Sequence, residues 1–240
     1  MNDPLHQFEI HRLIPLHLAG VDLSFTNSAL FMMLAVGAAS LFLLGGVRKP
    51  QAVPSRWQSM VEMVYSYIGT VLEETTGMEG RPYFPFIFTL FLFILTGNLL
   101  GMIPYSFTFT SQIVVTFGLA MISFGLCTLV GFWRHGVHYF SLFVPPGAPI
   151  YMLPLIVPIE ILSYLSRPVS LAIRLFANMM AGHTMLKVFA GFTVALGFYG
   201  LAPLCVNSIL TAFEVLVAVL QAYVFTILTC IYLRDALYLH

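Results

Sequence analysis

Long apolar runs separated by short polar segments set the pattern of this chain. The first run, residues 25–47, has 23 residues without a charge and ends at the basic pair Arg48 and Lys49. At about 1.5 Å per residue, such a helix is long enough to cross a hydrocarbon core. Residues 83–103 and 112–133 form two further runs with a short link between them. They predict an antiparallel hairpin of two crossing helices.

Residues 55–76 have a different pattern. Apolar residues such as Val61 and Ile68 recur there at helical spacing, whereas charged residues such as Glu62 lie largely on other faces. This pattern predicts an amphipathic helix that lies at the membrane interface or against partner helices and does not cross.

The last two apolar stretches, residues 150–190 and 203–235, exceed the roughly 20 residues that an upright crossing needs. They predict two long helices that form an antiparallel hairpin and are strongly tilted. Pro154, Pro158 and Pro168 are expected to bend or locally break the first of them. The predicted fold is therefore all-α: a polytopic membrane protein whose residues 1–240 form a single membrane domain, with five crossing helices and one amphipathic helix.

The composition agrees with a membrane protein. The chain is 59% hydrophobic and 8% charged, whereas soluble domains carry about 25% charged residues. A net charge of zero and the lack of a basic tract argue against a nucleic-acid partner. Cys127, Cys205 and Cys230 lie in apolar runs without metal-ligand spacing, so we expect small buried hydrophobic residues and no metal or cofactor.

Basic residues predict the orientation. With five crossings, a single loop arginine, Arg12, clearly falls on one side of the membrane. The opposite side receives Arg48, Lys49, Arg56, Arg81, Arg134 and Arg234. Because positive loops stay inside, the N-terminus is predicted outside and the C-terminus inside.

Arg174 lies in the middle of an otherwise apolar helical stretch. A guanidinium group stays protonated, so this charge cannot be removed by titration. Placing it near the bilayer centre costs at least about 2.5–3.5 kcal/mol on insertion scales. A chain that tolerates this cost is expected to use the charge. Ion translocation is the first hypothesis, and a structural ion pair is the alternative.

A single antiparallel alignment of the last two helices pairs most of their polar residues. The alignment is fixed by placing Arg174 opposite Gln221. It then sets Glu160 opposite Asp235 and His183 close to Glu214. Arg174 separates the His183–Glu214 pair from Glu160. Carboxylate and imidazole groups can exchange protons, but arginine cannot. This arrangement favours two half-channels separated by a charge, although His183 and Glu214 also fit a structural pair.

Small residues surround Arg174 on its helix. Ser170, Ala177 and Ala181 lie near its direction at about 100° per residue. Such a face lets another helix approach closely, which predicts a partner surface; internal packing of the two alanines is the alternative. The side-chain amides of Asn178 and Gln221 in the last two helices, and that of Asn98 in an earlier run, are suited to form hydrogen bonds between helices.

Three segments resemble a known family. Residues 166–183, SRPVSLAIRLFANMMAGH, closely resemble the signature helix of subunit a of F-type ATP synthase. Residues 213–225, FEVLVAVLQAYVF, resemble its final helix, and residues 96–104, TGNLLGMIP, resemble an earlier segment. The resemblance covers nearly the whole chain.

The resemblance implies a non-catalytic, proton-conducting stator subunit. Arg174 is implied to separate two offset half-channels that lead to and from the carboxylates of a ring of c subunits, so that proton flow drives rotation and ATP synthesis. His183 and Glu214 would line the uptake path, and Glu160 the release path. Asn178 and Gln221 would be polar neighbours of the arginine. The residues implied to face the ring are Ser170, Arg174, Ala177 and Ala181. Many bacterial members have Glu and His exchanged at positions 183 and 214, so the first proton acceptor stays open here.

The implied partners are the c-subunit ring, other synthase subunits, the lipid bilayer and protons. The hairpin 83–133 would contact the peripheral-stalk b subunits, with residues 55–76 alongside. The implied location is the bacterial inner membrane, or alternatively the mitochondrial inner membrane. Two other functions stay open. The prolines near Glu160 fit a self-contained secondary transporter, although no internal repeat is visible. A passive scaffold would leave Arg174 unexplained.

Overall fold

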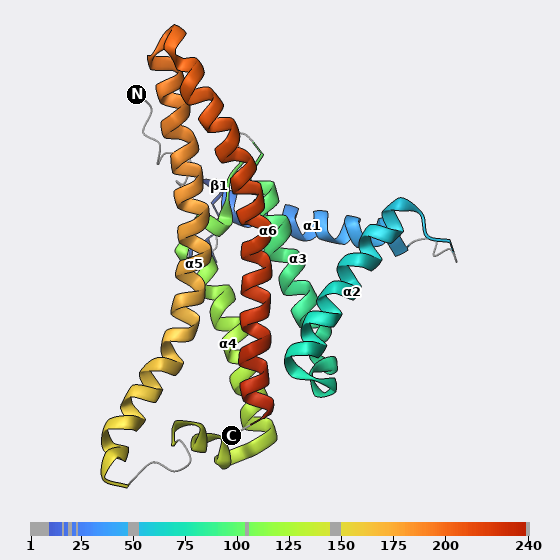
Figure 1. The fold of residues 1–240 in the computed structure, drawn as a ribbon, viewed down its shortest axis with the longest axis vertical. Coiled ribbons are helices and arrows are strands. Elements are labelled where there is room, and N and C mark those ends of the chain that lie inside the picture. The colour runs from blue at the N-terminus through green and yellow to red at the C-terminus, as the bar shows by residue number, and fades with distance from the viewer. Residues whose placement is uncertain are drawn as a thin grey trace.

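The computed structural model describes residues 10–15, 17–18, 21–22, 24–47, 53–103, 106–144 and 150–238. Helices dominate it (Figure 1). The α-helices are α1 (Asn27–Val47), α2 (Arg56–Thr76), α3 (Phe84–Gly101), α4 (Ile113–His135), α5 (Leu153–Ala195) and α6 (Leu201–Leu237). Short 3-10 segments are η2 (Met78–Tyr83), η3 (Phe109–Ser111), η4 (Gly136–Phe143), η5 (Ile150–Met152) and η6 (Gly197–Gly200).

In the described part of the N-terminal region, four short strands precede the helices. β1 (Arg12–Ile14) pairs with β4 (Phe25–Thr26), and β2 (His17–Leu18) pairs with β3 (Val21–Asp22), both antiparallel. The first helix was predicted from residue 25 but begins at Asn27, because the two preceding residues belong to β4. The Asn27 side chain accepts a hydrogen bond from the backbone N–H of Ser28 at 2.9 Å, which satisfies a donor at the helix start.

Five helical segments of the described residues are long and apolar enough to cross a membrane, as predicted. They are Asn27–Val47, Met78–Gly101, Ile113–Phe143, Leu153–Ala195 and Gly197–Leu237. Helix α2 is not among them, and its buried positions, which include Val61, Ile68 and Leu72, form one stripe. That stripe packs against neighbouring helices, so the amphipathic helix is confirmed.

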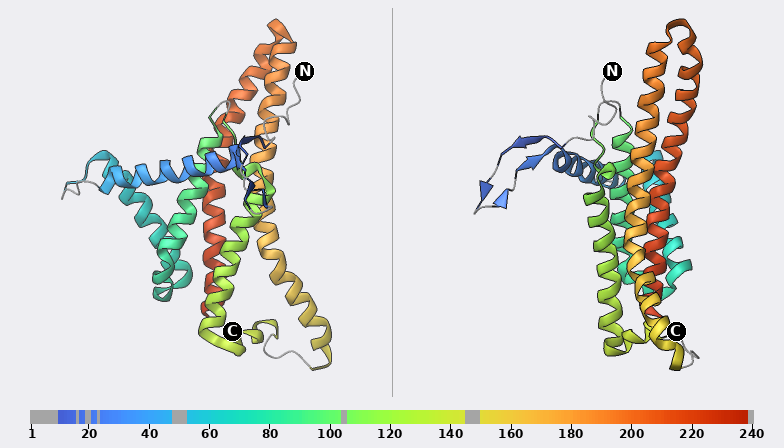
Figure 2. Two further views of the ribbon diagram at one scale, coloured as in Figure 1. Left: turned by 180° about the vertical axis from the view of Figure 1, so that it is seen from behind. Right: turned by 90° about the vertical axis from the view of Figure 1, so that its left-hand side faces the viewer.

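The long hairpin of α5 and α6 organises the other helices (Figures 1 and 2). α3 packs on α6, and α4 packs on both α5 and α6. Residues 83–103 and 112–133 were predicted to form an antiparallel hairpin. The corresponding helices, α3 and α4, follow one another in the chain, and their main contacts are with the last two helices. The two figures also show α1 running across the long direction of α5 and α6.

The main core lies where α3, α4, α5 and α6 meet, and Leu175 and Phe225 are fully buried in it. Asn98 is also buried there, and its Nδ2 donates a hydrogen bond of 3.1 Å to the carbonyl of Ala218. This contact confirms the predicted interhelical hydrogen bond. Cys205 is exposed in the isolated chain, whereas Cys127 and Cys230 are buried. The prediction that all three cysteines are buried is therefore wrong for Cys205.

Candidate functional site

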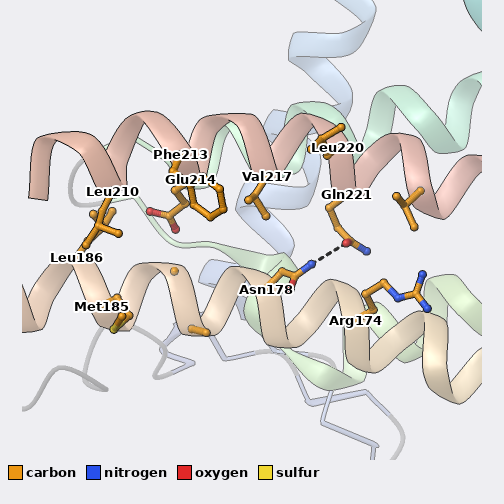
Figure 3. A pocket seen from close by; sticks show the side chains of 13 residues that line it. Arg174, Asn178, Met185, Leu186, Leu210, Phe213, Glu214, Val217, Leu220 and Gln221 are labelled. Carbon is orange, nitrogen blue, oxygen red and sulfur yellow. Dashed lines mark hydrogen bonds between the residues drawn. The ribbon is translucent and has the colours of Figure 1, made fainter. Parts of the chain in front are cut away.

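A cavity of about 580 Å³ lies between α5 and α6 (Figure 3). Most of its lining is apolar, and four polar side chains project into the same space from the two helices. These are Arg174 and Asn178 of α5 and Glu214 and Gln221 of α6. Ala181 and Gly182 of α5 line the cavity as well. The structure thus brings together a fixed cation, a carboxylate and two amides along one cavity.

His183 and Glu214 form a buried pair at one end of this group. His183 Nδ1 contacts Glu214 Oε1, and both side chains are at least nine-tenths buried. On the other side of the ring, Nε2 lies 2.8 Å from Thr108 Oγ1 and 3.0 Å from the carbonyl oxygen of Gly101. The predicted neighbourhood of His183 and Glu214 is confirmed. The contacts to Thr108 and Gly101 were not predicted.

Gly182 makes room for the Glu214 carboxyl group. A Cβ at this position would lie 2.5 Å from Glu214 Oε1 and 2.9 Å from its Cδ. Since such approaches are much closer than van der Waals contact, only the absence of a side chain lets the carboxyl group lie against α5. Glu214 Oε2 is buried and has no hydrogen-bond partner among the described residues.

Arg174 lies on the opposite face of α5 from His183. It is exposed in the isolated chain, and none of the described residues forms a hydrogen bond or ion pair with its side chain. Ser170, Ala177 and Ala181 are exposed as well. The predicted combination of a projecting cation with small neighbours on an accessible face is therefore present, while His183 points into the subunit.

The predicted register of the two helices needs a correction near Arg174. Among the described residues, the hydrogen-bond partner of Gln221 is Asn178 and not Arg174: Asn178 Nδ2 donates a hydrogen bond of 2.7 Å to Gln221 Oε1. Asn178 is one helical turn beyond Arg174, so both face the cavity. Gln221 Nε2 is buried without a partner among the described residues.

Asp235 has a different partner from the predicted one. Arg167 Nη1 donates to Asp235 Oδ2 at 2.8 Å, and its guanidinium lies over the rings of Tyr164 and Tyr232. Two carboxylates repel one another, so opposite charge favours Arg167 over Glu160 as the partner. The α5 segment that carries Glu160 also diverges from α6 in Figure 1. Glu160 is half-buried, outside the cavity lining, and has no bonded partner among the described residues.

Comparison with known proteins decides the family. The family model described as ATP synthase A chain matches residues 29–234. The chain belongs to the ATP synthase A chain family. ATP synthase subunit a of Chelativorans sp. (strain BNC1) is 53% identical over 243 residues, which cover 98% of each chain. ATP synthase subunit a of Rhodospirillum rubrum is 52% identical over 241 residues, which cover 100% of each. The family resemblance indicated by the sequence motifs is confirmed.

The contacts of Arg167 predict a measurable contribution of this side chain to stability. Arg167→Ala leaves Asp235 partly buried without its cation, so we expect a loss of roughly 1–3 kcal/mol from the α5–α6 hairpin. Thermal release of subunits from the purified complex measures this loss.

The matched test exchanges the two charges. Arg167→Asp combined with Asp235→Arg is expected to recover part of the stability that either single change removes, because the ion pair is restored. Additive losses in the double variant would show that the ion pair itself contributes nothing.

Proposed function

We propose that this chain is the proton-translocating stator subunit of the membrane sector of F-type ATP synthase. It has no catalytic site of its own and provides two offset half-channels to and from the carboxylates of the c-subunit ring. The observation that carries this proposal is the placement of Arg174: an arginine that cannot deprotonate projects from an accessible face. The same cavity that Arg174 lines reaches a buried carboxylate–imidazole pair.

The uptake path leads through the cavity between α5 and α6. Protons from the outer side reach Glu214 beside His183 and then move past the Asn178–Gln221 hydrogen bond toward the ring. The two amides offer donors and acceptors to water along an otherwise apolar wall. They also give polar groups beside Arg174 without adding another charge.

Arg174 acts on the ring by electrostatic attraction. A ring carboxylate that has released its proton is negative, and an opposite charge stabilises that form. Once protonated from the uptake side, the carboxyl group is neutral and can move into lipid. Ser170, Ala177 and Ala181 leave room for ring helices to pass close to the guanidinium. Direct proton passage between the half-channels is blocked because arginine holds its protons.

Glu160 is proposed for the release path. It lies on the other side of Arg174 from His183 along α5, beyond the bend that the prolines favour. A half-buried carboxylate in that position can receive protons from the ring side and pass them to water. Its separation from the cavity fits two offset paths rather than one continuous channel.

The chain is a multi-pass membrane protein of the bacterial inner membrane in this proposal, with the N-terminus outside and the C-terminus cytoplasmic. Since α1 runs across the direction of α5 and α6 (Figure 1), an upright α1 leaves the long hairpin strongly tilted around the ring. The α2–α4 side is proposed to contact the peripheral-stalk b subunits.

Cysteine cross-linking tests the ring-facing surface. Ser170→Cys and Ala177→Cys are introduced singly, with Cys205 replaced by Ser because it is exposed. Both are expected to form disulfides with cysteines on ring helices in the assembled complex. Trp133→Cys is the matched control, since Trp133 of α4 is 93% exposed but lies on another helix. Ring cross-links at position 133 and none at 170 or 177 would contradict the proposed face.

A further inference from the structure

We infer that Thr108 and the backbone carbonyl of Gly101 hold the His183 ring in one protonation pattern, so that Glu214 is the group that exchanges protons with the cavity. This inference rests on the proposed function and deepens it. It gives Thr108 a positioning role and decides which member of the acid–imidazole pair accepts an incoming proton.

The hydrogen-bond partners of Nε2 determine where its proton is. A carbonyl oxygen can only accept, so the 3.0 Å contact to Gly101 requires a hydrogen on His183 Nε2. The Thr108 hydroxyl donates its own hydrogen to the same carbonyl at 3.3 Å. Its oxygen is then free to accept from Nε2 at 2.8 Å. In this arrangement each of the three groups has a hydrogen-bond partner.

A fixed hydrogen on Nε2 limits what the ring can do. A relay through imidazole would need one ring nitrogen to release a proton while the other accepts one. Two contacts of Nε2 bear on this. The Gly101 carbonyl has no hydrogen to pass on, and the Thr108 hydroxyl already donates its hydrogen to that carbonyl, so neither group carries a proton away. The ring contacts Glu214 through Nδ1, on its other side. His183 supports the charge of the carboxyl group but does not conduct.

The carboxyl group has the access that the ring lacks. Glu214 lines the cavity, and its Oε2 has no hydrogen-bond partner among the described residues. A proton from the outer aqueous side binds Glu214, which changes the charge of the pair by one. The same carboxyl group then releases it toward the ring carboxylate. No proton has to cross the imidazole.

The local structure fixes the Thr108 hydroxyl in place. Thr108 is buried, and Ser111 Oγ donates a hydrogen bond of 2.6 Å to its carbonyl. A Cβ at Gly101 would lie 2.6 Å from both Thr108 Cγ2 and Thr108 Oγ1. The bare backbone at the end of α3 therefore lets the threonine pack directly onto it. Phe109 follows in η3, which packs against α5.

Two substitutions test whether His183 is a fixed partner of Glu214 or a proton relay. Proton flux is measured in vesicles that contain the assembled complex, driven by an imposed potential. Glu214→Gln is expected to reduce the flux to background, because an amide neither gains nor loses a proton. His183→Gln keeps a polar group next to Glu214, so we expect a loss of only roughly three- to tenfold. Equal and complete loss in both variants would overturn the inference.

Thr108 has a matched control in the same loop. Thr108→Val is expected to lower the flux roughly three- to tenfold by releasing the ring. Thr108→Ser restores the hydroxyl and should restore the flux. Thr110→Val removes an equally buried hydroxyl that has no hydrogen-bond partner in the described chain, and it should leave the flux unchanged.

The outcomes separate the two proposals. Unchanged flux in Glu214→Gln would reject the proposed uptake path itself. Blocked flux in Glu214→Gln, together with identical behaviour of Thr108→Val and Thr110→Val, would keep the uptake path and reject the positioning role of Thr108. The amount of assembled complex is measured for every variant, so that flux is compared per complex.

Discussion

Replacing Arg174 by alanine is expected to abolish proton-driven ATP synthesis while the complex still assembles. The side chain is exposed and makes no bond to another described residue, so its loss should not disturb the fold. Without the guanidinium, a ring carboxylate loses the charge that holds it ionised between the half-channels. Protons can then pass between the two paths without a full turn of the ring. We expect synthesis to fall to background and passive proton leak to appear.

Lys187→Ala is the matched control for this variant. Lys187 is another exposed cation of the same helix, but it does not line the cavity. Its loss is expected to leave synthesis near the wild-type rate. Synthesis and ATP-driven pumping are measured in inverted membrane vesicles. Normal ATP-driven pumping by Arg174→Ala would contradict the proposed function.

Glu214→Gln is expected to slow proton uptake from the outer side by at least roughly tenfold, since a glutamine carries no exchangeable charge. Glutamine has nearly the same size, so its packing against Gly182 is kept. The effect should appear in proton flux and in synthesis alike. ATP hydrolysis by the detached catalytic sector should not change.

Glu74→Gln provides the comparison for this substitution. Glu74 is exposed on α2, outside the cavity, so removing its charge should not alter the flux. If Glu214→Gln and Glu74→Gln both conduct like the wild type, Glu214 is not on the uptake path.

Most helix positions could be predicted from sequence because run length and periodicity are local properties. The amphipathic helix was predicted over residues 55–76 and extends over Arg56–Thr76, with Ser55 accepting a capping hydrogen bond from Gln58 at 3.3 Å. Both long helices extend beyond their predicted bounds at the hairpin turn, α5 to Ala195 and α6 from Leu201. Their connection is shorter than predicted because apolar residues near the turn still favour helix.

The packing partners of the helices were harder to predict. The short link between residues 83–103 and 112–133 predicted an antiparallel hairpin, but it did not indicate that α3 and α4 bury their faces mainly against α5 and α6. The predicted antiparallel alignment of the last two helices also differed from the structure at two of its three pairs, Arg174 with Gln221 and Glu160 with Asp235. A straight antiparallel alignment ignores the bend of α5 and the reach of long side chains. Arg167 therefore bonds Asp235, although Glu160 was aligned with it.

The sequence by itself determined the membrane helices, the fixed charge of Arg174 within one of them and the face of small residues beside it. These follow from hydrophobic pattern, from a charge that cannot be titrated away and from helical periodicity. Only the tertiary structure decided how His183 is held. Its Nε2 contacts a hydroxyl 75 residues away and a backbone carbonyl 82 residues away. Every residue has a backbone carbonyl, so no sequence pattern marks the one that folding places against the ring.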